Sequence, residues 1–370
     1  MITPMSTATT DLLPFPGLRD VPAAEGPQTG KEFTSDQEVR WCPGCGDYAV
    51  LKAVQGFLPD LGLRRENIVF ISGIGCSSRF PYYLDTYGMH SIHGRAPAIA
   101  TGLATSRADL SVWVVTGDGD ALSIGGNHLI HTLRRNVNMT ILLFNNRIYG
   151  LTKGQYSPTS EPGKVTKSTP MGSVDNPFNP ISLALGAEGT FVARTVDSDR
   201  KHLTEVLSAA AAHRGTSLVE IYQNCPIFND GAFDAIKDRD TKADAIIPLR
   251  HGEPVRFGAP DESGLGRRGV VRDLTTGGLR IADDVTALGA DERLLVHDAH
   301  DPDPTTAYAL SRLTGAGALT HAPVGIFRQV EAATYDDQVR EQVVTATSGT
   351  SAPIEALGSL LSAGDTWTVS

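Results

Sequence analysis

Two patterns of apolar residues alternate along the chain from residue 47 to residue 222. Short runs that are apolar throughout predict buried β-strands, and apolar residues at every third or fourth position predict amphipathic helices. Strands are predicted at 68–72, 112–116, 139–144, 190–196 and 218–222. Helices are predicted at 47–57, 96–109, 124–135, 178–186 and 203–211. Such strands, apolar on both faces and separated by helices, favour an α/β fold with a doubly wound, mostly parallel sheet.

Both ends of the chain depart from this alternation. Residues 1–30 are rich in Pro, Thr, Ala and Gly and have no periodicity, which predicts a flexible N-terminal arm. Beyond residue 250 the chain becomes rich in Gly and charged residues, and its helical and strand patterns are weak. We therefore divide the chain into an arm (1–30), a central domain (31–250) and a C-terminal extension (251–370).

Residues with candidate chemistry follow the ends of predicted strands. Cys76, Asp118, Asn146 and Cys225 each come shortly after a different strand. In an open parallel sheet, ligands bind at the carboxyl ends of the strands, where loops and helix N-termini meet. The sequence therefore predicts that these four residues lie along one edge of the sheet.

Composition and charge exclude several classes of protein. The 370 residues form a chain of 39.3 kDa, which is large enough to bury a sizeable core. The net charge of −10 argues against a nucleic-acid-binding protein, because such proteins need a basic surface. The sequence has no run of about 18 apolar residues and no signal segment. We therefore expect no membrane association and a cytoplasmic location.

The chain has four cysteines, and each stands beside Gly or Pro. Cys42 and Cys45 belong to a Cys-Pro-Gly-Cys-Gly motif, Cys76 to Gly-Ile-Gly-Cys-Ser and Cys225 to Asn-Cys-Pro. Gly and Pro let the backbone curl around a bound centre and turn its N–H groups toward sulfur. Disulfides are rare in a reducing cytoplasm, and four thiolates complete the ligands of one [4Fe–4S] cluster or one structural zinc. The cysteines alone leave both centres open.

A second motif suits a diphosphate and a divalent cation. Gly117 and Gly119 flank Asp118 at the end of a predicted strand, where small residues let the backbone approach phosphate closely. Asn146 follows the next strand. Carboxylate and amide oxygens are hard ligands that suit Mg²⁺. The combination predicts a magnesium–diphosphate site.

These motifs resemble one known family. Gly117-Asp-Gly with Asn146 is similar to the metal and diphosphate motif of the thiamine-diphosphate-binding fold. Together with the two cysteine motifs, His93-Gly-Arg and Leu151-Thr-Lys-Gly-Gln, it resembles the β subunits of 2-oxoacid:ferredoxin oxidoreductases, most closely the 2-oxoglutarate type. The resemblance covers about residues 31–240, is looser over 241–345 and is absent from the first 30 residues.

The resemblance implies cofactors and the residues that hold them. It implies one [4Fe–4S] cluster, rather than zinc, close to a bound thiamine diphosphate. The implied cluster ligands are Cys42, Cys45, Cys76 and Cys225. Mg²⁺ would be bound by Asp118, Asn146 and the backbone oxygen of Ile148. The residues implied to line thiamine diphosphate are Ile74, Gly75, Ser77, His93, Gly117, Gly119 and Asp120.

The implied activity is the oxidative decarboxylation of 2-oxoglutarate with CoA to succinyl-CoA and CO₂, with electrons passing through the cluster to ferredoxin. His93 and Arg95 are the candidate catalytic residues. Either could hold the diphosphate or the substrate carboxylate, and His93 could move protons near neutral pH. A structural hydrogen bond is the alternative role for His93.

The far carboxylate of 2-oxoglutarate needs a positive partner, because burying an unpaired carboxylate is costly. Arg79 and Lys153 are the candidates, and Leu151 would form part of the pocket wall. Pyruvate or a branched-chain 2-oxo acid is the alternative substrate, since an apolar substrate would favour apolar residues instead.

The sequence also predicts partners. Thiamine enzymes use a carboxylate to activate the cofactor, and no Glu of this chain lies in a matching motif. The family places that group on an α subunit, so we expect an α/β assembly, doubled to α₂β₂, and a separate ferredoxin as electron acceptor. A non-catalytic iron–sulfur electron-transfer subunit is the alternative from a different class, and the Asp118–Asn146 pair argues against it.

Overall fold

The computed structural model describes residues 15–314, 317, 319–348, 353–365 and 367. Its strands are β1 (Ile68–Ser72), β2 (Tyr87–His90), β3 (Ser111–Gly117), β4 (Met139–Asn145), β5 (Phe191–Val196), β6 (Thr216–Tyr222), β7 (Ile246–Leu249), β8 (Arg256–Pro260), β9 (Gly266–Asp273), β10 (Leu279–Ala282), β11 (Glu292–Leu294) and β12 (Ala322–Gln329). Its α-helices are α1 (Asp47–Phe57), α2 (Ala96–Ser106), α3 (Gly126–Arg135), α4 (Pro180–Gly186), α5 (Arg200–Ala212), α6 (Asp234–Lys237), α7 (Lys242–Ala245), α8 (Thr305–Ser311), α9 (Tyr335–Thr347) and α10 (Pro353–Leu361).

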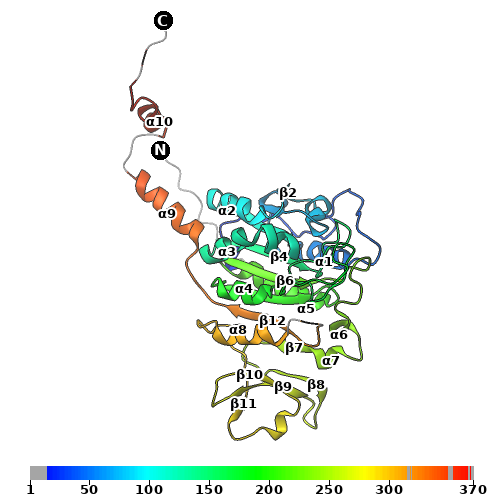
Figure 1. Cartoon of the computed structure of the whole chain (residues 1–370). Coiled ribbons are helices and arrows are strands. Elements are labelled where there is room, and N and C mark those ends of the chain that lie inside the picture. The colour runs from blue at the N-terminus through cyan, green and yellow to red at the C-terminus, as the bar shows by residue number, and fades with distance from the viewer. Residues whose placement is uncertain (1–14, 315–316, 318, 349–352, 366, 368–370) are drawn as a thin grey trace.

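Eight strands form the central sheet, in the order β2-β1-β3-β4-β6-β5-β12-β7 (Figure 1). The six strands from β2 to β5 are all parallel. β12 pairs antiparallel with β5, and β7 runs parallel to β12 at the edge of the sheet. The predicted α/β fold with a doubly wound, mostly parallel sheet is confirmed.

Helices cover both faces of this sheet. α1 and α5 pack on one face, and α2, α3, α4 and α8 pack on the other. β3 shows how one strand serves both layers: Trp113 and Val115 belong to the core under α1 and α5, whereas Val112 and Val114 belong to the opposite core. Successive side chains of a strand point to opposite faces, so a strand buried on both sides must be apolar throughout. This requirement explains the apolar runs of the sequence.

The C-terminal half adds a small antiparallel sheet and then returns to the main sheet. In the small sheet β9 pairs with β8, β10 and β11, and in Figure 1 it lies beyond β7, below the main body. Its strands are rich in Gly and charged residues, which is why the sequence pattern was weak there. The chain then passes through α8 into β12 beside β5. The domain boundary at residue 250 stays a prediction. β7, which precedes it, and β12, which follows it, are paired in the main sheet.

Beyond β12 the chain leads away from the body through α9 and α10 (Figure 1). Arg340 of α9 donates to the Ala104 carbonyl of α2, which fixes α9 to the body near that point. Among the described residues, no helix is both long and apolar enough to cross a lipid bilayer.

Part of the predicted N-terminal arm packs on the body. Residues 1–14 lie outside the described residues, but Phe15, Leu18 and Val21 are buried in the core beneath α1 and α5. Phe15 makes an edge-to-face contact with Phe57 of α1, with ring centroids 6.5 Å apart. From residue 15 onward the segment is therefore attached to the fold rather than extended from it.

A fully buried ion pair joins three strands of the main sheet. Arg194 of β5 donates from Nε to Glu220 Oε2 of the neighbouring β6 at 2.7 Å, and both side chains are at most 1% exposed. Arg194 also donates to the Pro323 carbonyl of β12 at 3.2 Å, and its guanidinium lies over the ring of Phe327. The pair thus attaches the antiparallel β12 to the parallel part of the sheet.

Replacing Arg194 by Met should lower the free energy of unfolding by about 3–5 kcal/mol, because the Glu220 carboxylate would stay buried without its partner. Replacing both residues by Met should recover most of this loss, since no unpaired charge would remain. Urea unfolding followed by circular dichroism would measure both effects. A single variant as stable as the wild type would contradict this role.

Candidate functional site

The carboxyl ends of β1, β3, β4 and β6 lie side by side in the sheet. Gly117, the last residue of β3, is level with Phe144 of β4, and Asn145 is level with Tyr222, the last residue of β6. The loops after these strands carry Cys76, Asp118, Asn146 and Cys225. The structure therefore brings to one edge the loops that the sequence predicted to meet there.

One cavity lies between these loops and encloses about 80 Å³. It is lined by residues from the loop after β1, from the Gly-Asp-Gly turn and from the chain after β4. The predicted site residues in its lining are Ile74, Gly75, Cys76, Ser77, His93, Gly117, Asp118, Gly119, Asp120, Asn146, Ile148 and Leu151. Arg79, Arg95 and Lys153 lie outside this lining.

Asp118 is buried without a basic neighbour among its hydrogen-bond partners. Its Oδ2 accepts from Ser157 Oγ and from Thr159 Oγ1, both at 2.5 Å. Burial raises the pKa of Asp118 to about 6, although these two hydroxyls and nearby backbone N–H groups oppose the rise. A buried carboxylate held by neutral donors suits a bound cation, because the cation would offset the cost of burying the charge.

The two asparagines after β4 have different tasks. Asn146 lines the cavity, and its Oδ1 accepts from the backbone N–H of Ile148 at 3.1 Å. Asn145 points into the fold, where its Nδ2 donates to Glu220 at 2.7 Å and its Oδ1 accepts from the backbone N–H of Arg147 at 3.1 Å. Only Asn146 is therefore placed to offer an oxygen to a metal in the cavity.

Asp120 holds three segments of the site together. Its Oδ1 accepts from the backbone N–H of Gly94 at 2.8 Å and of Ile74 at 3.1 Å, and its Oδ2 accepts from Thr116 at 2.7 Å. A Cβ at position 73 would lie 1.8 Å from Asp120 Oδ2, so only glycine fits at position 73. Asp120 lines the cavity, but donors of the chain already occupy its oxygens.

His93 and Arg95 differ in their relation to the cavity. His93 lines it, and its Nδ1 lies 2.7 Å from Asp120 Oδ1, a close contact without hydrogen-bond alignment. Arg95 precedes α2, and its Nη1 donates to the His93 carbonyl at 3.3 Å. His93 can thus reach a bound group directly, whereas Arg95 acts on the loop that carries His93.

Only one of the three predicted substrate-binding residues lines the cavity. Leu151 lines the cavity and is 42% exposed. Arg79 donates to the Arg40 carbonyl at 2.6 Å, and its positive charge lowers the pKa of the Cys76 thiol against the larger effect of burial. Lys153 is exposed on the turn after Leu151. Arg79 is therefore close to the Cys76 thiol, and Lys153 is exposed outside the cavity lining.

The four cysteines converge beside the cavity. A Cβ on Gly150 would lie 3.5 Å from Cys76 Sγ and 3.7 Å from Cys225 Sγ. The Cys45 thiol is close enough to both for their charges to raise its pKa, and Cys42 has the same effect on Cys76. Within the part of the chain that the structure describes, no three His, Cys, Asp or Glu side chains form the compact group of a single metal ion.

N–H donors surround these thiols. The backbone N–H groups of Ile227, Phe228 and Asn229 face Cys225 and lower the pKa of its thiol, although burial raises it more. Gln223 donates from Nε2 to Cys45 Sγ at 3.3 Å. Donors aimed at sulfur are typical of iron–sulfur sites, where they set the reduction potential. The donor set therefore fits a [4Fe–4S] cluster.

Sequence reasoning missed several residues of the site. Asp47 is fully buried beside Cys45, and burial raises its pKa to about 7. In the sequence it looked like an ordinary acidic residue at a helix start. Ser157, Thr159 and Asn229 come from loops without a motif, so only their contacts with Asp118 and Asn146 reveal them.

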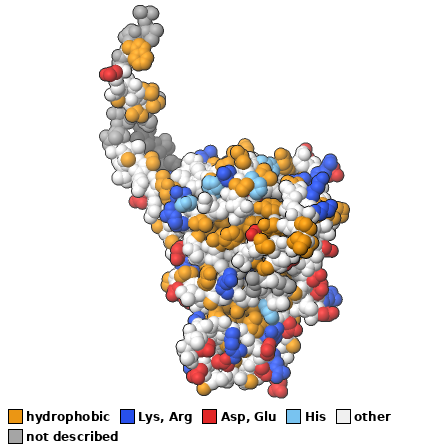
Figure 2. Space-filling view, in the orientation of Figure 1, with side chains coloured by type: hydrophobic (Ala, Val, Ile, Leu, Met, Phe, Trp, Pro, Cys, Tyr) orange, Lys and Arg blue, Asp and Glu red, His pale blue; other side chains and the backbone are white. Residues whose placement is uncertain are grey.

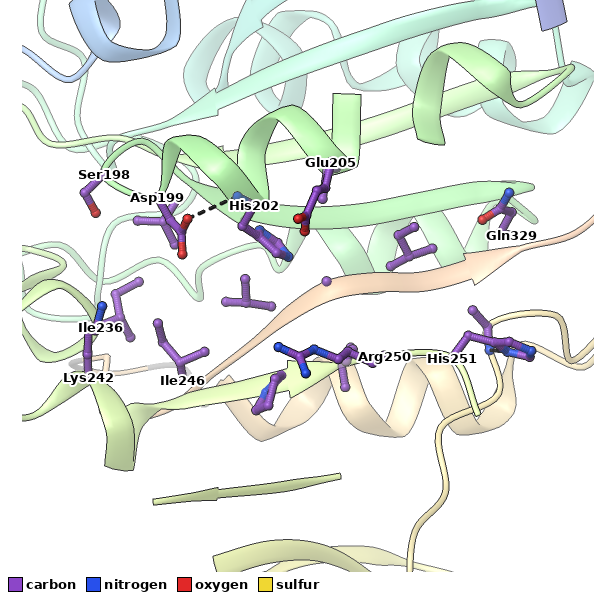
Figure 3. Close-up of a pocket in the computed structure, with 18 of the residues that line it drawn as sticks. Ser198, Asp199, His202, Glu205, Ile236, Lys242, Ile246, Arg250, His251 and Gln329 are labelled. Atoms are coloured by element: carbon purple, nitrogen blue, oxygen red, sulfur yellow. Dashed lines mark hydrogen bonds between the residues drawn. The ribbon is translucent and has the colours of Figure 1, made fainter. Parts of the chain in front are cut away.

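A larger cavity of about 590 Å³ lies elsewhere, between α5 and the strands β7 and β12 (Figure 3). His202 and Glu205 point into it from α5, and Arg250 faces them from the chain after β7. Its lining carries both acidic and basic side chains and none of the residues predicted from the sequence. It is therefore separate from the thiols and from Asp118.

Known proteins resemble this chain over most of its length. Residues 73–221 match the family described as thiamine pyrophosphate enzyme, C-terminal TPP binding domain. The chain is 66% identical over 349 residues to the 2-oxoglutarate oxidoreductase subunit KorB of Mycobacterium tuberculosis, covering 94% of this chain and 91% of that protein. It is 46% identical over 192 residues to the 2-oxoacid:ferredoxin oxidoreductase subunit beta of Sulfolobus sp., covering 51% of this chain and 63% of the relative.

A solved structure agrees with these relatives. A chain of the 2-oxoglutarate:ferredoxin oxidoreductase from Magnetococcus marinus, solved with 2-oxoglutarate, coenzyme A and succinyl-CoA bound, superposes with a TM-score of 0.70 at 34% identity. The alignment covers 92% of this chain and 99% of that one. Sequence, fold and site point the same way: the chain belongs to the thiamine-diphosphate-binding β subunits of the 2-oxoacid oxidoreductases, in the group of the 2-oxoglutarate oxidoreductases.

Proposed function

We propose that the chain is the β subunit of a CoA-acylating 2-oxoglutarate:ferredoxin oxidoreductase. The reaction converts 2-oxoglutarate and CoA to succinyl-CoA and CO₂, and two electrons leave one at a time to ferredoxin. The observation that supports the proposal is that two sets of candidate ligands lie at the same edge of the sheet. The oxygens of Asp118 and Asn146 line one cavity, and the thiols of Cys76 and Cys225 converge beside it.

Asp118, Asn146 and the backbone oxygen of Ile148 would hold Mg²⁺ on the diphosphate. All three residues line the cavity, and Asp118 is a buried acid with neutral hydrogen-bond partners. Gly117 and Gly119 leave the backbone open to phosphate at the same place. When bound, thiamine diphosphate supplies the electron sink for decarboxylation.

Cys42, Cys45, Cys76 and Cys225 would hold the [4Fe–4S] cluster. Burial raises the pKa of the Cys45 and Cys76 thiols, the latter to about 11, so the free thiols keep their protons at neutral pH. Bound iron would supply the positive charge that the thiolates need. The long sequence spans between the Cys-Pro-Gly-Cys motif and its partners suit no compact zinc module.

His93 and Arg95 would act on the bound cofactor and substrate from the loop before α2. Asp120 Oδ1 lies 2.7 Å from His93 Nδ1, and Nε2 on the other side of the ring could hold or move a proton in the cavity. Arg95 would keep this loop in place through the His93 carbonyl. In this proposal His93 is the catalytic residue, and Arg95 supports it.

An α subunit would complete the site. The cavity of about 80 Å³ is far smaller than the roughly 300–1,000 Å³ of ordinary ligand sites, so this chain encloses only part of a cofactor. Tyr87 and Met89 of β2, Ile99 of α2 and Ile92 between these two elements are exposed apolar side chains. Figure 2 shows apolar patches on the upper part of the molecule. An α subunit on this surface, in an α₂β₂ assembly, would bury them and close the cavity.

The complex of this chain with its α subunit, purified without oxygen, should reduce a low-potential dye only when 2-oxoglutarate and CoA are both present. Pyruvate and branched-chain 2-oxo acids should react more slowly, because they cannot pair with Arg79 or Lys153. The chain alone should show little activity. A preference for pyruvate would overturn the substrate assignment, and no reaction with any 2-oxo acid would overturn the enzyme assignment.

Two single substitutions should remove the cofactors separately, because the ligand sets are separate. Cys225→Ser should lose iron and the visible iron–sulfur absorbance but keep its affinity for thiamine diphosphate. Asp118→Asn should keep its iron and bind thiamine diphosphate and Mg²⁺ more weakly. Iron, acid-labile sulfide and thiamine would be measured in the same preparations. Full iron in Cys225→Ser, or unchanged thiamine diphosphate affinity in Asp118→Asn, would refute the corresponding assignment.

The substrate assignment predicts a difference between two KM values. Arg79→Met combined with Lys153→Met should raise the KM for 2-oxoglutarate about tenfold or more, because a charge-assisted contact to the far carboxylate is lost. The KM for pyruvate should change much less, since pyruvate has no such carboxylate. Steady-state kinetics on the α/β complex would measure both KM values. Equal changes would show that neither residue contacts the far carboxylate of 2-oxoglutarate.

A further inference from the structure

Asn229 touches both of the loops that carry ligands. Its backbone N–H donates to the Cys225 carbonyl at 3.0 Å, four residues back in the same turn, and also faces the Cys225 thiol. Its side-chain Nδ2 donates to the backbone carbonyl of Asn146 at 2.8 Å. The side chain is only 5% exposed. A single buried residue therefore connects the last cysteine to the asparagine at the cavity.

The orientation of the Asn229 amide is fixed by a lysine. Lys164 Nζ donates to Asn229 Oδ1 and is itself held by Glu161 Oε1 at 2.9 Å. An ammonium group can only donate, so the oxygen of the amide must face Lys164 and the nitrogen must face the Asn146 carbonyl. The amide is thus held from both sides and cannot rotate without losing a buried contact.

The carbonyl that Asn229 holds belongs to the peptide between Asn146 and Arg147. Arg147 has a left-handed backbone, with φ at 57°, and the turn it makes leads directly to Ile148. The next carbonyl, that of Arg147, accepts from Ser160 Oγ at 2.6 Å. The Asn229 contact therefore sets the position of the turn that bears two of the three proposed magnesium ligands.

We propose that Asn229 is a positioning residue that fixes the separation between the iron–sulfur cluster and the magnesium-bound diphosphate. The inference rests on the cofactor sites of the proposed function. Electron transfer slows steeply as donor and acceptor move apart, so this enzyme needs a constant spacing between its two cofactors. Asn229 holds that spacing through a backbone hydrogen bond to Cys225 and side-chain hydrogen bonds to the carbonyls of Asn146 and Arg147, while binding neither cofactor.

The test compares Asn229→Ala with a matched control, Asn67→Ala, in the anaerobic α/β complex. Asn67 is also buried, and its Nδ2 donates to the Asp109 carbonyl at 2.9 Å, but it lies at the opposite edge of the sheet, before β1. Asn229→Ala should raise the Kd of thiamine diphosphate at fixed Mg²⁺ about tenfold. It should also shift the midpoint potential of the cluster, followed by electron paramagnetic resonance. Asn67→Ala should lower stability and move neither value.

A second variant covers the case in which Asn229→Ala does not fold. Asn229→Asp keeps the size of the side chain but turns an oxygen toward the Asn146 carbonyl, so it should move the same two values. A wild-type complex without iron and thiamine would overturn the proposed function and this inference together. This inference alone would be overturned if the wild-type complex holds both cofactors but the Asn229 variants behave like Asn67→Ala. It would also be overturned if those variants change only the Kd of thiamine diphosphate or only the midpoint potential of the cluster.

Discussion

The parallel alignment of β1, β3, β4 and β6 determines where the candidate site can form. Because these strands are parallel neighbours, their loops leave the sheet at one edge. Residues that are far apart in the sequence, such as Cys76 and Cys225, can then approach the same point. The fold brings together side chains that no single segment of the chain could supply.

A series of buried hydrogen bonds connects the centre of the sheet to the candidate site. Arg194 donates to Glu220, Glu220 accepts from Asn145, and the Thr159 hydroxyl lies between Asn145 Oδ1 and Asp118 Oδ2 and shares its one proton with these two acceptors. Every member of this chain of hydrogen bonds is buried, so loss of one partner would leave a costly unpaired group. The antiparallel β12, which also receives a hydrogen bond from Arg194, is thereby linked to the proposed magnesium ligand.

The sequence predicted those features that one segment expresses by itself. The central strands were visible because burial on both faces demands apolar runs, and the motifs around Cys76, Asp118 and Asn146 were visible because they are short and local. β2 was not predicted, since all of its residues are exposed. Asp47, Thr159 and Asn229 were missed because only contacts with distant segments give them a role.

In the proposed function, iron–sulfur and thiamine chemistry meet at this one edge of the sheet. Anomalous X-ray scattering at the iron absorption edge, on crystals of the anaerobic α/β complex, tests it most directly. We expect iron among Cys42, Cys45, Cys76 and Cys225, with the diphosphate beside Asp118 in the adjacent cavity. A single zinc ion at the cysteines, or iron bound away from them, would contradict it.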